Sequence, residues 1–273
     1  MISRMEIAEE IKETALQIAK NHVEEINLVQ EVYDLTEAVF ECGSKFFVNG
    51  VTTLPHDYGR HSICFSSLYK GLIGLNNAID SVLQGRIGLA FLCLRQIVEY
   101  LIVAKVAVLD SSDTMLCDWI EQKDINMQRN IYNHLDLKKE DENGINQLRD
   151  FFKTLGAFVH SSRVSQQVSH KYENVKEEVE TVFSMILIIF QMYRHLLFTV
   201  YMPNLSWYIS YYTPEIFDKT KRLKFLLDED RKKQTPAARR VVSFYKRNWV
   251  FKKLPTLPES RRLKLDEYRK RII

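Results

Sequence analysis

A few charged or titratable side chains of this sequence stand in apolar helical surroundings, where chemistry would be expected. Arg95 and Glu99 are four positions apart in an almost wholly apolar run, so they share a helix face and can form a partly buried ion pair. A buried pair is costly unless its other hydrogen bonds are satisfied. The pair therefore indicates either a structural contact that orients neighbouring helices or part of a catalytic site.

His160 is the second candidate, because it follows the apolar helical segment 151–159 and precedes two serines. Histidine can take up and release a proton near neutral pH, as a general acid–base catalyst must. A histidine at a helix end also interacts favourably with the helix dipole without any catalytic role. We expect a catalytic role for His160 only if Arg95 and Glu99 approach it.

The elements that must position these residues are predicted to be helices throughout. Apolar residues recur at the spacing of one helix face in nearly every segment, which predicts an all-α multi-helix bundle. Residues 2–43 predict one long helix or two with a break near Asn21–Glu25. Further helices are predicted over 60–83 (ended by Gly85), 86–109, 113–119, 124–137, 141–159, 172–202 (ended by Pro203) and 214–233, and prolines divide the rest.

Charge is divided along the chain. Residues 215–273 contain 19 of the 38 Lys and Arg and 8 of the 35 Asp and Glu, so their net charge is +11. Residues 1–214 have a net charge of −8, and the two parts together give the +3 of the whole chain. We therefore expect three parts: an N-terminal helix or helical pair (1–58), a bundle core (59–212) and a basic helical tail (213–273). A basic tail predicts an anionic partner.

In the tail, basic doublets alternate with aromatic residues, a composition typical of single-stranded RNA-binding segments. The residues expected to bind nucleic acid, with RNA preferred to DNA, are Arg239, Arg240, Lys246, Arg247, Trp249, Lys252 and Lys253. The alternative is a helical extension that docks on the acidic body or on a partner protein. In that case Val241, Val242, Phe244 and Tyr245 would be packing residues.

Several function classes are excluded by missing motifs. The sequence has no phosphate-binding glycine loop, no HExxH or GxSxG motif and no Cys/His spacing typical of zinc sites, so no cofactor and no metal are expected. The apolar stretches 97–109 and 183–202 contain charged or polar residues, and we interpret both as core helices rather than membrane spans. A cytoplasmic protein is expected.

Two motifs resemble a known family. The run from Leu83 through Gly85 and Ala90 to Arg95 and Glu99 is similar to a Gly…Ala…Arg…Glu pattern of HEPN-like bacterial proteins, and the helix end at 151–162 is similar to their L-S-x-x-V-H segment. Over roughly 62–170 the chain thus resembles the HEPN superfamily, all-α bundles found in toxin–antitoxin, abortive-infection and CRISPR-linked proteins. Active members are metal-independent endoribonucleases with an Arg-x4–6-His motif, and HEPN-like domains commonly pair.

The resemblance implies roles for particular residues. His160 would move protons to and from the ribose 2′-hydroxyl and the leaving oxygen, while Arg95 or Lys153 would stabilise charge on phosphorus and Glu99 would orient Arg95. The chain departs from the motif because Lys153 stands where an Arg is expected before His160, and Lys lacks the planar guanidinium fork. Arg163 and His170 do have the required spacing, in a polar segment.

Two functions are therefore expected from the sequence. The first is a HEPN-like nucleic-acid-associated protein, a metal-independent endoribonuclease if active, in prokaryotic defence or toxin–antitoxin biology. The second is a non-catalytic helical adaptor that binds a protein or nucleic acid through its basic tail. In either case we expect a homodimer, with residues 183–202 supplying apolar surface for the helix interface.

Overall fold

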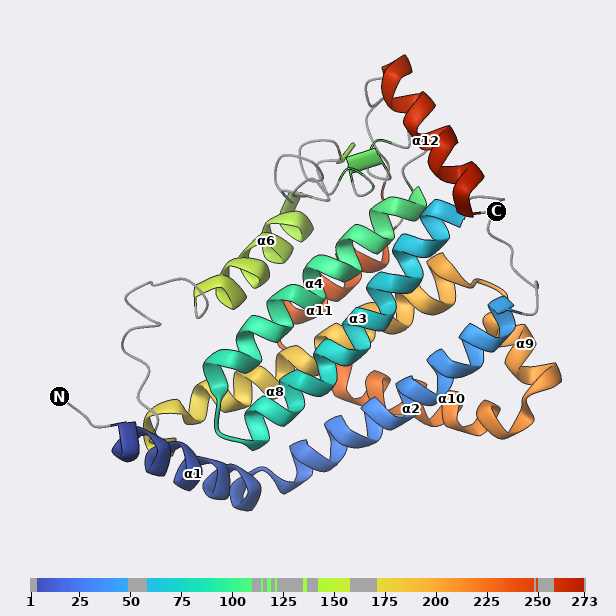
Figure 1. The fold of residues 1–273 in the computed structure, drawn as a ribbon. Helices are drawn as coiled ribbons and strands as arrows, with labels where there is room; N and C mark the ends of the chain where they lie inside the picture. Colours follow the sequence, from blue (N-terminus) through green and yellow to red (C-terminus); the bar gives the residue numbers. More distant parts are fainter. Residues whose placement is uncertain are drawn as a thin grey trace.

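The structure is a computed structural model that describes residues 4–48, 58–109, 142–157, 171–247 and 258–272, together with residues 114, 117, 118, 121, 135, 136 and 249. Long helices dominate the described part of the chain, so the predicted all-α class is confirmed (Figure 1). The helices predicted over 113–119 and 124–137 lie largely outside the described residues.

Of the two alternatives predicted for residues 2–43, the structure shows two helices with a break. Helix α1 spans Arg4–Asn21 and α2 spans Val23–Val48, separated at His22. His22 is buried, and its Nε2 atom lies 3.0 Å from the hydroxyl oxygen of Tyr172. The break therefore coincides with a polar contact between the N-terminal helices and the start of α8.

Helices α3 (Tyr58–Leu83) and α4 (Ile87–Leu109) form an antiparallel pair joined at Gly85. Gly85 has a φ of +72°, a left-handed conformation that side chains with a Cβ disfavour, and a Cβ there would stand 2.5 Å from the carbonyl oxygen of Ile11. The glycine therefore ends α3 as predicted, and it also lets α1 approach the turn.

The remaining helices follow the predicted order with two differences. Helix α6 spans Glu142–Ala157, and the predicted helix 172–202 consists of α8 (Tyr172–His195) and a π-helical turn, η4 (Leu196–Tyr201). The sequence reading did not predict α9 (Leu205–Tyr212). The last helices are α10 (Pro214–Lys233), α11 (Pro236–Lys246) and α12 (Glu259–Ile272). Helix α10 begins with the proline at its first turn, as predicted, and α11 begins at one of the prolines that were expected to divide the tail.

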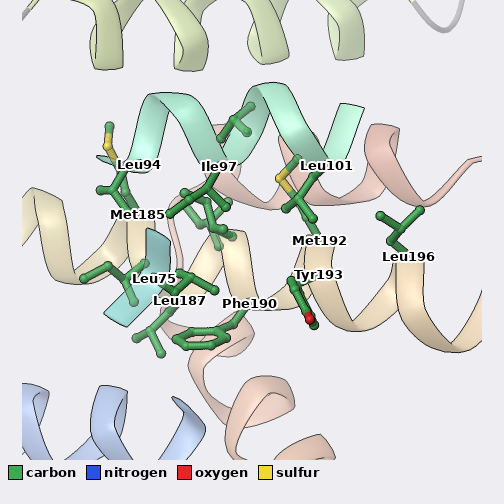
Figure 2. Close-up of a cluster of buried hydrophobic side chains, with 14 of the residues drawn as sticks. Leu75, Leu94, Ile97, Leu101, Met185, Leu187, Phe190, Met192, Tyr193 and Leu196 are labelled. Atoms are coloured by element: carbon green, nitrogen blue, oxygen red, sulfur yellow. The ribbon is translucent and has the colours of Figure 1, made fainter. Parts of the chain in front are cut away.

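The core lies between α4 and α8, with α3 against both of them (Figure 2). Ile97 and Leu101 of α4 and Phe190 and Tyr193 of α8 belong to this core, and all four side chains are fully buried. Burying aliphatic and aromatic side chains is the main favourable term in folding. Helices α4 and α8 are therefore the centre around which the other helices are placed.

The C-terminal helices share this core. Leu223 and Leu227 of α10, Val242 and Tyr245 of α11, and Trp249 belong to the same buried cluster as Ile18 of α1. The boundary drawn at residues 212 and 213 from charge therefore coincides with no break in the core. At least as far as Trp249, the basic segment packs as part of the helical body.

Two helical stretches, α4 and Tyr172–Tyr201, have the length and apolar composition of a membrane span. Half of the most apolar window of α4 and 72% of that of the second stretch are buried inside the protein. Both stretches contribute many side chains to the buried core.

Candidate functional site

Arg95 and Glu99 form the predicted ion pair on α4. The Nε atom of Arg95 lies 3.5 Å from Oε1 of Glu99, and the two side chains are 22% and 40% exposed. The guanidinium carbon of Arg95 is 4.9 Å from the ring centroid of Phe152 on α6, within the range of a cation–π contact. The pair thus lies at the partly exposed edge between α4 and α6, where Phe152 and Glu99 fix the position of the guanidinium.

The structure places Lys153 differently from Arg95. Its side chain is 78% exposed, and its Nζ atom lies 3.5 Å from Oδ1 of Asp150 on the same helix. His160, Arg163 and His170 lie outside the described residues. Among the predicted catalytic residues, the geometry is therefore known for the Arg95–Glu99 pair and for Lys153.

The predicted nucleic-acid-binding residues divide into exposed and buried positions. Arg239 and Arg240 are exposed on α11, and neither forms an ion pair with another residue that the structure describes. Lys246 is half-buried, and burial is the main cause of its lowered pKa. Trp249 is only 6% exposed, and its Nε1–H donates to the carbonyl of Phe244 at 3.1 Å. Lys252 and Lys253 lie outside the described residues.

The packing alternative is what the structure shows for α11. Val241, Val242, Phe244 and Tyr245 are buried against the body, mainly on α6 and α8. The Trp249 ring lies 5.7 Å from both Phe244 and Tyr245, and Lys105 stands over it at 4.3 Å. The aromatic residues of this stretch are therefore part of the core rather than a surface on which bases could stack.

A buried lysine, Lys105 of α4, holds this packing together. It is 1% exposed, and its Nζ donates to the backbone carbonyls of Tyr245 and Arg247, the latter at 2.8 Å. The Tyr245 ring lies 4.6 Å from the same atom, and the Tyr245 hydroxyl donates to the carbonyl of Leu101 at 2.9 Å. Helix α4 thus satisfies the C-terminal carbonyls of α11, the groups that a helix leaves unpaired.

Positive charge gathers around this contact. Burial lowers the pKa of Lys105 to about 7. Burial also lowers the pKa of His195 to about 4, assisted by the charges of Lys105, Lys246 and Arg194. Near neutral pH the imidazole is thus uncharged and the amine is only about half protonated, and the rings of Tyr245 and Trp249 cover the amine. The arrangement is suited to fixing α11 rather than to reacting with a substrate.

A groove of about 490 Å³ is lined by residues of α6, α8 and the start of α11. Its floor is apolar, with Phe151, Met185, Ile188 and Val241, and its rim carries the carboxylates Asp150, Glu177 and Glu180 together with hydroxyl groups. None of the described residues that line it is a lysine, an arginine or a histidine. A phosphate group would meet negative charge here, so this groove lacks the chemistry of a nucleotide-binding or phosphoryl-binding site.

Sequence reasoning missed the contact made by Lys105, although one signal was present. A lysine within the apolar run 97–109 must either reach solvent or find buried acceptors. The sequence does not reveal which acceptors it finds, because the carbonyls lie 140 and 142 positions away. Within the described residues, no group of three or more His, Cys, Asp or Glu side chains is placed to hold a metal ion.

The chain was compared with protein-family models, with curated proteins and with solved structures, and none of them matches.

Proposed function

We propose that this protein binds nucleic acid through the exposed cations of α11. The observation that carries the proposal is the division of α11 into two sides, with an apolar side packed on the body and Arg239 and Arg240 in solvent. Residues 236–249 contain four basic and no acidic residues. A rigid helix that presents unpaired arginines is suited to phosphate groups, which accept two parallel hydrogen bonds from one guanidinium.

The neighbouring helix α10 is less suited to this role, because four of its seven cations are paired with carboxylates. On α10, Arg222 pairs with Glu31 of α2 at 2.7 Å, Lys224 pairs with Asp228 at 2.9 Å, and Lys232 pairs with Glu229. These exposed pairs are weak and screened by salt, but they lower the local positive potential. Arg239 and Arg240 are thus stronger phosphate-binding candidates than the paired cations of α10.

The preference for RNA rests on the HEPN-like resemblance, and the binding mode rests on α11. With Phe244, Tyr245 and Trp249 buried, binding through this helix is driven by phosphates rather than by base stacking. We therefore expect weak sequence preference and an affinity that falls steeply as salt is raised.

The test is a fluorescence anisotropy titration of labelled single-stranded RNA of mixed sequence over a series of salt concentrations. Changing Arg239 and Arg240 together to Gln should weaken binding. The slope of log affinity against log salt concentration should become less steep by about 1.4, at roughly 0.7 for each lost phosphate contact. The matched control is Lys12→Gln with Lys20→Gln on α1, which removes the same charge from another exposed helix. Equal affinities for both double variants would refute the proposal.

Point substitutions are preferable to removing the whole basic segment. Helices α10 and α11 bury Leu223, Leu227, Val242 and Tyr245 in the common core, so deletion of residues 215–273 would expose that core. Binding by the wild type that is insensitive to salt, or binding only to an acidic protein, would favour the non-catalytic adaptor.

A second candidate function, metal-independent RNA cleavage, is favoured by the arrangement of Arg95. Its guanidinium is held between Glu99 and the Phe152 ring while 22% of its side chain stays exposed, so it is positioned in advance for an anionic group. Helix α6, which carries Phe152, leads in sequence towards His160. If the protein is a ribonuclease, RNA should be cut in the presence of EDTA, and His160→Ala and Arg95→Lys should each lower the rate at least about tenfold. No cleavage by the wild type, or equal cleavage by all three proteins, would refute this function.

A further inference from the structure

Helix α9 displays aromatic side chains to solvent. Trp207, Tyr211 and Tyr212 are 50%, 70% and 63% exposed, whereas Leu205 and Ile209 on the same helix are fully buried. The Trp207 ring centroid lies 5.1 Å from that of Tyr211 and 5.7 Å from that of Tyr212, distances at which aromatic rings attract each other. The three rings therefore form one continuous surface, which we name the α9 aromatic patch.

The α9 aromatic patch carries no charge. Residues 202–213 contain no Asp, Glu, Lys, Arg or His, although 27% of the whole chain is charged, and the other exposed positions of α9 are Ser206 and Ser210. The centres of protein–protein interfaces are depleted in charged residues and enriched in Trp and Tyr. A single-stranded nucleic acid or an anionic lipid surface would instead require cations beside the rings. The composition of the patch therefore favours a protein partner.

The patch is held rigidly at the edge of the molecule. Figure 1 shows α9 at one side of the bundle, beside the end of α2 and the start of α10 and far from α6. Leu205 packs over Gly43 of α2, where a Cβ would stand 3.4 Å from the leucine side chain. The Sγ atom of Cys42 lies 3.3 Å from the hydroxyl oxygen of Thr213. A surface fixed by such contacts loses little conformational freedom when it binds.

We propose that the α9 aromatic patch is a contact between two copies of this chain. In a two-fold interface, residues near the axis meet their own counterparts, so a charged patch repels itself while an uncharged one does not. The two helices that contact α9 carry exposed charges of both signs, Glu41 and Lys45 on α2 and Glu215 and Lys219 on α10, so opposite charges can face each other around the patch.

The proposed interface differs from the one expected from sequence. Residues 183–202 were expected to supply the dimer surface, but their apolar side chains are mostly buried in the core of one chain. The α9 aromatic patch is one short helix, smaller than the roughly 800 Å² per partner of a standard stable interface. We therefore expect a reversible dimer with a dissociation constant of about micromolar size.

The first experiment measures molar mass by light scattering and sedimentation over about 1 to 300 µM protein. The mass should rise from one chain to two across this range. Trp207→Ser with Tyr211→Ser should raise the dissociation constant at least about tenfold, because exposed Trp and Tyr dominate such contacts. Leu16→Ser, at a residue that is 65% exposed on α1, is the matched control and should leave the constant unchanged.

The second experiment separates self-association from binding to another protein. Ser210→Asp and Ser210→Lys each place a like charge opposite its own copy, so each variant alone should remain monomeric. An equal mixture of the two should regain the dimer, because opposite charges then meet across the interface. A wild type that is monomeric throughout the range, a dimer unaffected by Trp207→Ser with Tyr211→Ser, or a mixture that does not recover would overturn the proposal.

Discussion

Replacement of Lys105 by Met tests how the basic segment is attached to the body. Lys105 is fully buried, donates to the carbonyls of Tyr245 and Arg247, and lies between the rings of Tyr245 and Trp249. Methionine matches its length and apolar stem but cannot donate. Lys105→Met therefore removes a costly buried amine and at the same time leaves two carbonyls unpaired, at about 1–3 kcal/mol each.

These two effects depend differently on pH, so the pH dependence identifies the contribution of the amine. Burial lowers the pKa of Lys105 from 10.5 to about 7, so between these values the unfolded chain holds the proton and the folded chain does not. The stability contributed by Lys105 therefore rises with pH through this window and falls as the pH drops towards 7. At about 1.4 kcal/mol per pH unit, the wild type should gain about 2 kcal/mol between pH 7 and pH 9 that Lys105→Met lacks.

Urea unfolding followed by circular dichroism at the two pH values measures this difference. Lys12→Met, at an exposed lysine of α1, is the control and should keep the pH dependence of the wild type. The neutral amine still has two N–H groups for the two carbonyls, so its loss of charge need not release α11. If wild type and Lys105→Met gained stability in parallel, Lys105 would keep its proton when folded, held by the carbonyls and the two rings, and the reasoning from burial would be refuted.

Three further predictions concern stability and use the same unfolding assay. Burial, reinforced by nearby cations, lowers the pKa of His195 from 6.5 to about 4, so stability should fall as the pH drops below 6.5, and His195→Gln should flatten this loss. Gly85→Ala should destabilise the protein by more than about 1 kcal/mol, because Gly85 has a positive φ. Gly88→Ala should stabilise it by about 0.5–1 kcal/mol, because Gly88 lies within α4 with open space around it. If Gly88→Ala were the more destabilising of the two, the explanation from backbone conformation would be wrong. The hydroxyl of Tyr193 is buried with no hydrogen-bond partner among the described residues, so Tyr193→Phe should be neutral or stabilising by up to about 1 kcal/mol, and a clear loss would reveal a missed partner.

The helices were predictable because their signals are local. The break at His22, the end of α3 at Gly85 and the proline-led start of α10 each depend on a few neighbouring residues. Helix α9 was not predicted, because its eight residues, within the ten between Pro203 and Pro214, are too few to show a helical period. The change from α to π geometry at Leu196 also has no local signal of this kind.

The candidate site was less predictable, because burial depends on distant partners. Trp249 stands among basic residues and is buried, while Trp207 stands in an uncharged run and is half exposed. Local composition suggests the reverse for both. The difference arises because Lys105, Phe244 and Tyr245 cover Trp249, and only the folding of α11 onto α4 and α8 brings them together.

The sequence by itself determined the all-α class, most helix boundaries and the division of charge between residues 1–214 and 215–273, since each follows from residue order and type. Only the tertiary structure decided what the charges do. It buries Lys105 against carbonyls 140 and 142 positions away, pairs Arg222 with Glu31, and leaves Arg239 and Arg240 in solvent. A charge interacts with whatever lies within a few ångströms, and in a helical bundle those neighbours are set by helix packing rather than by position in the chain.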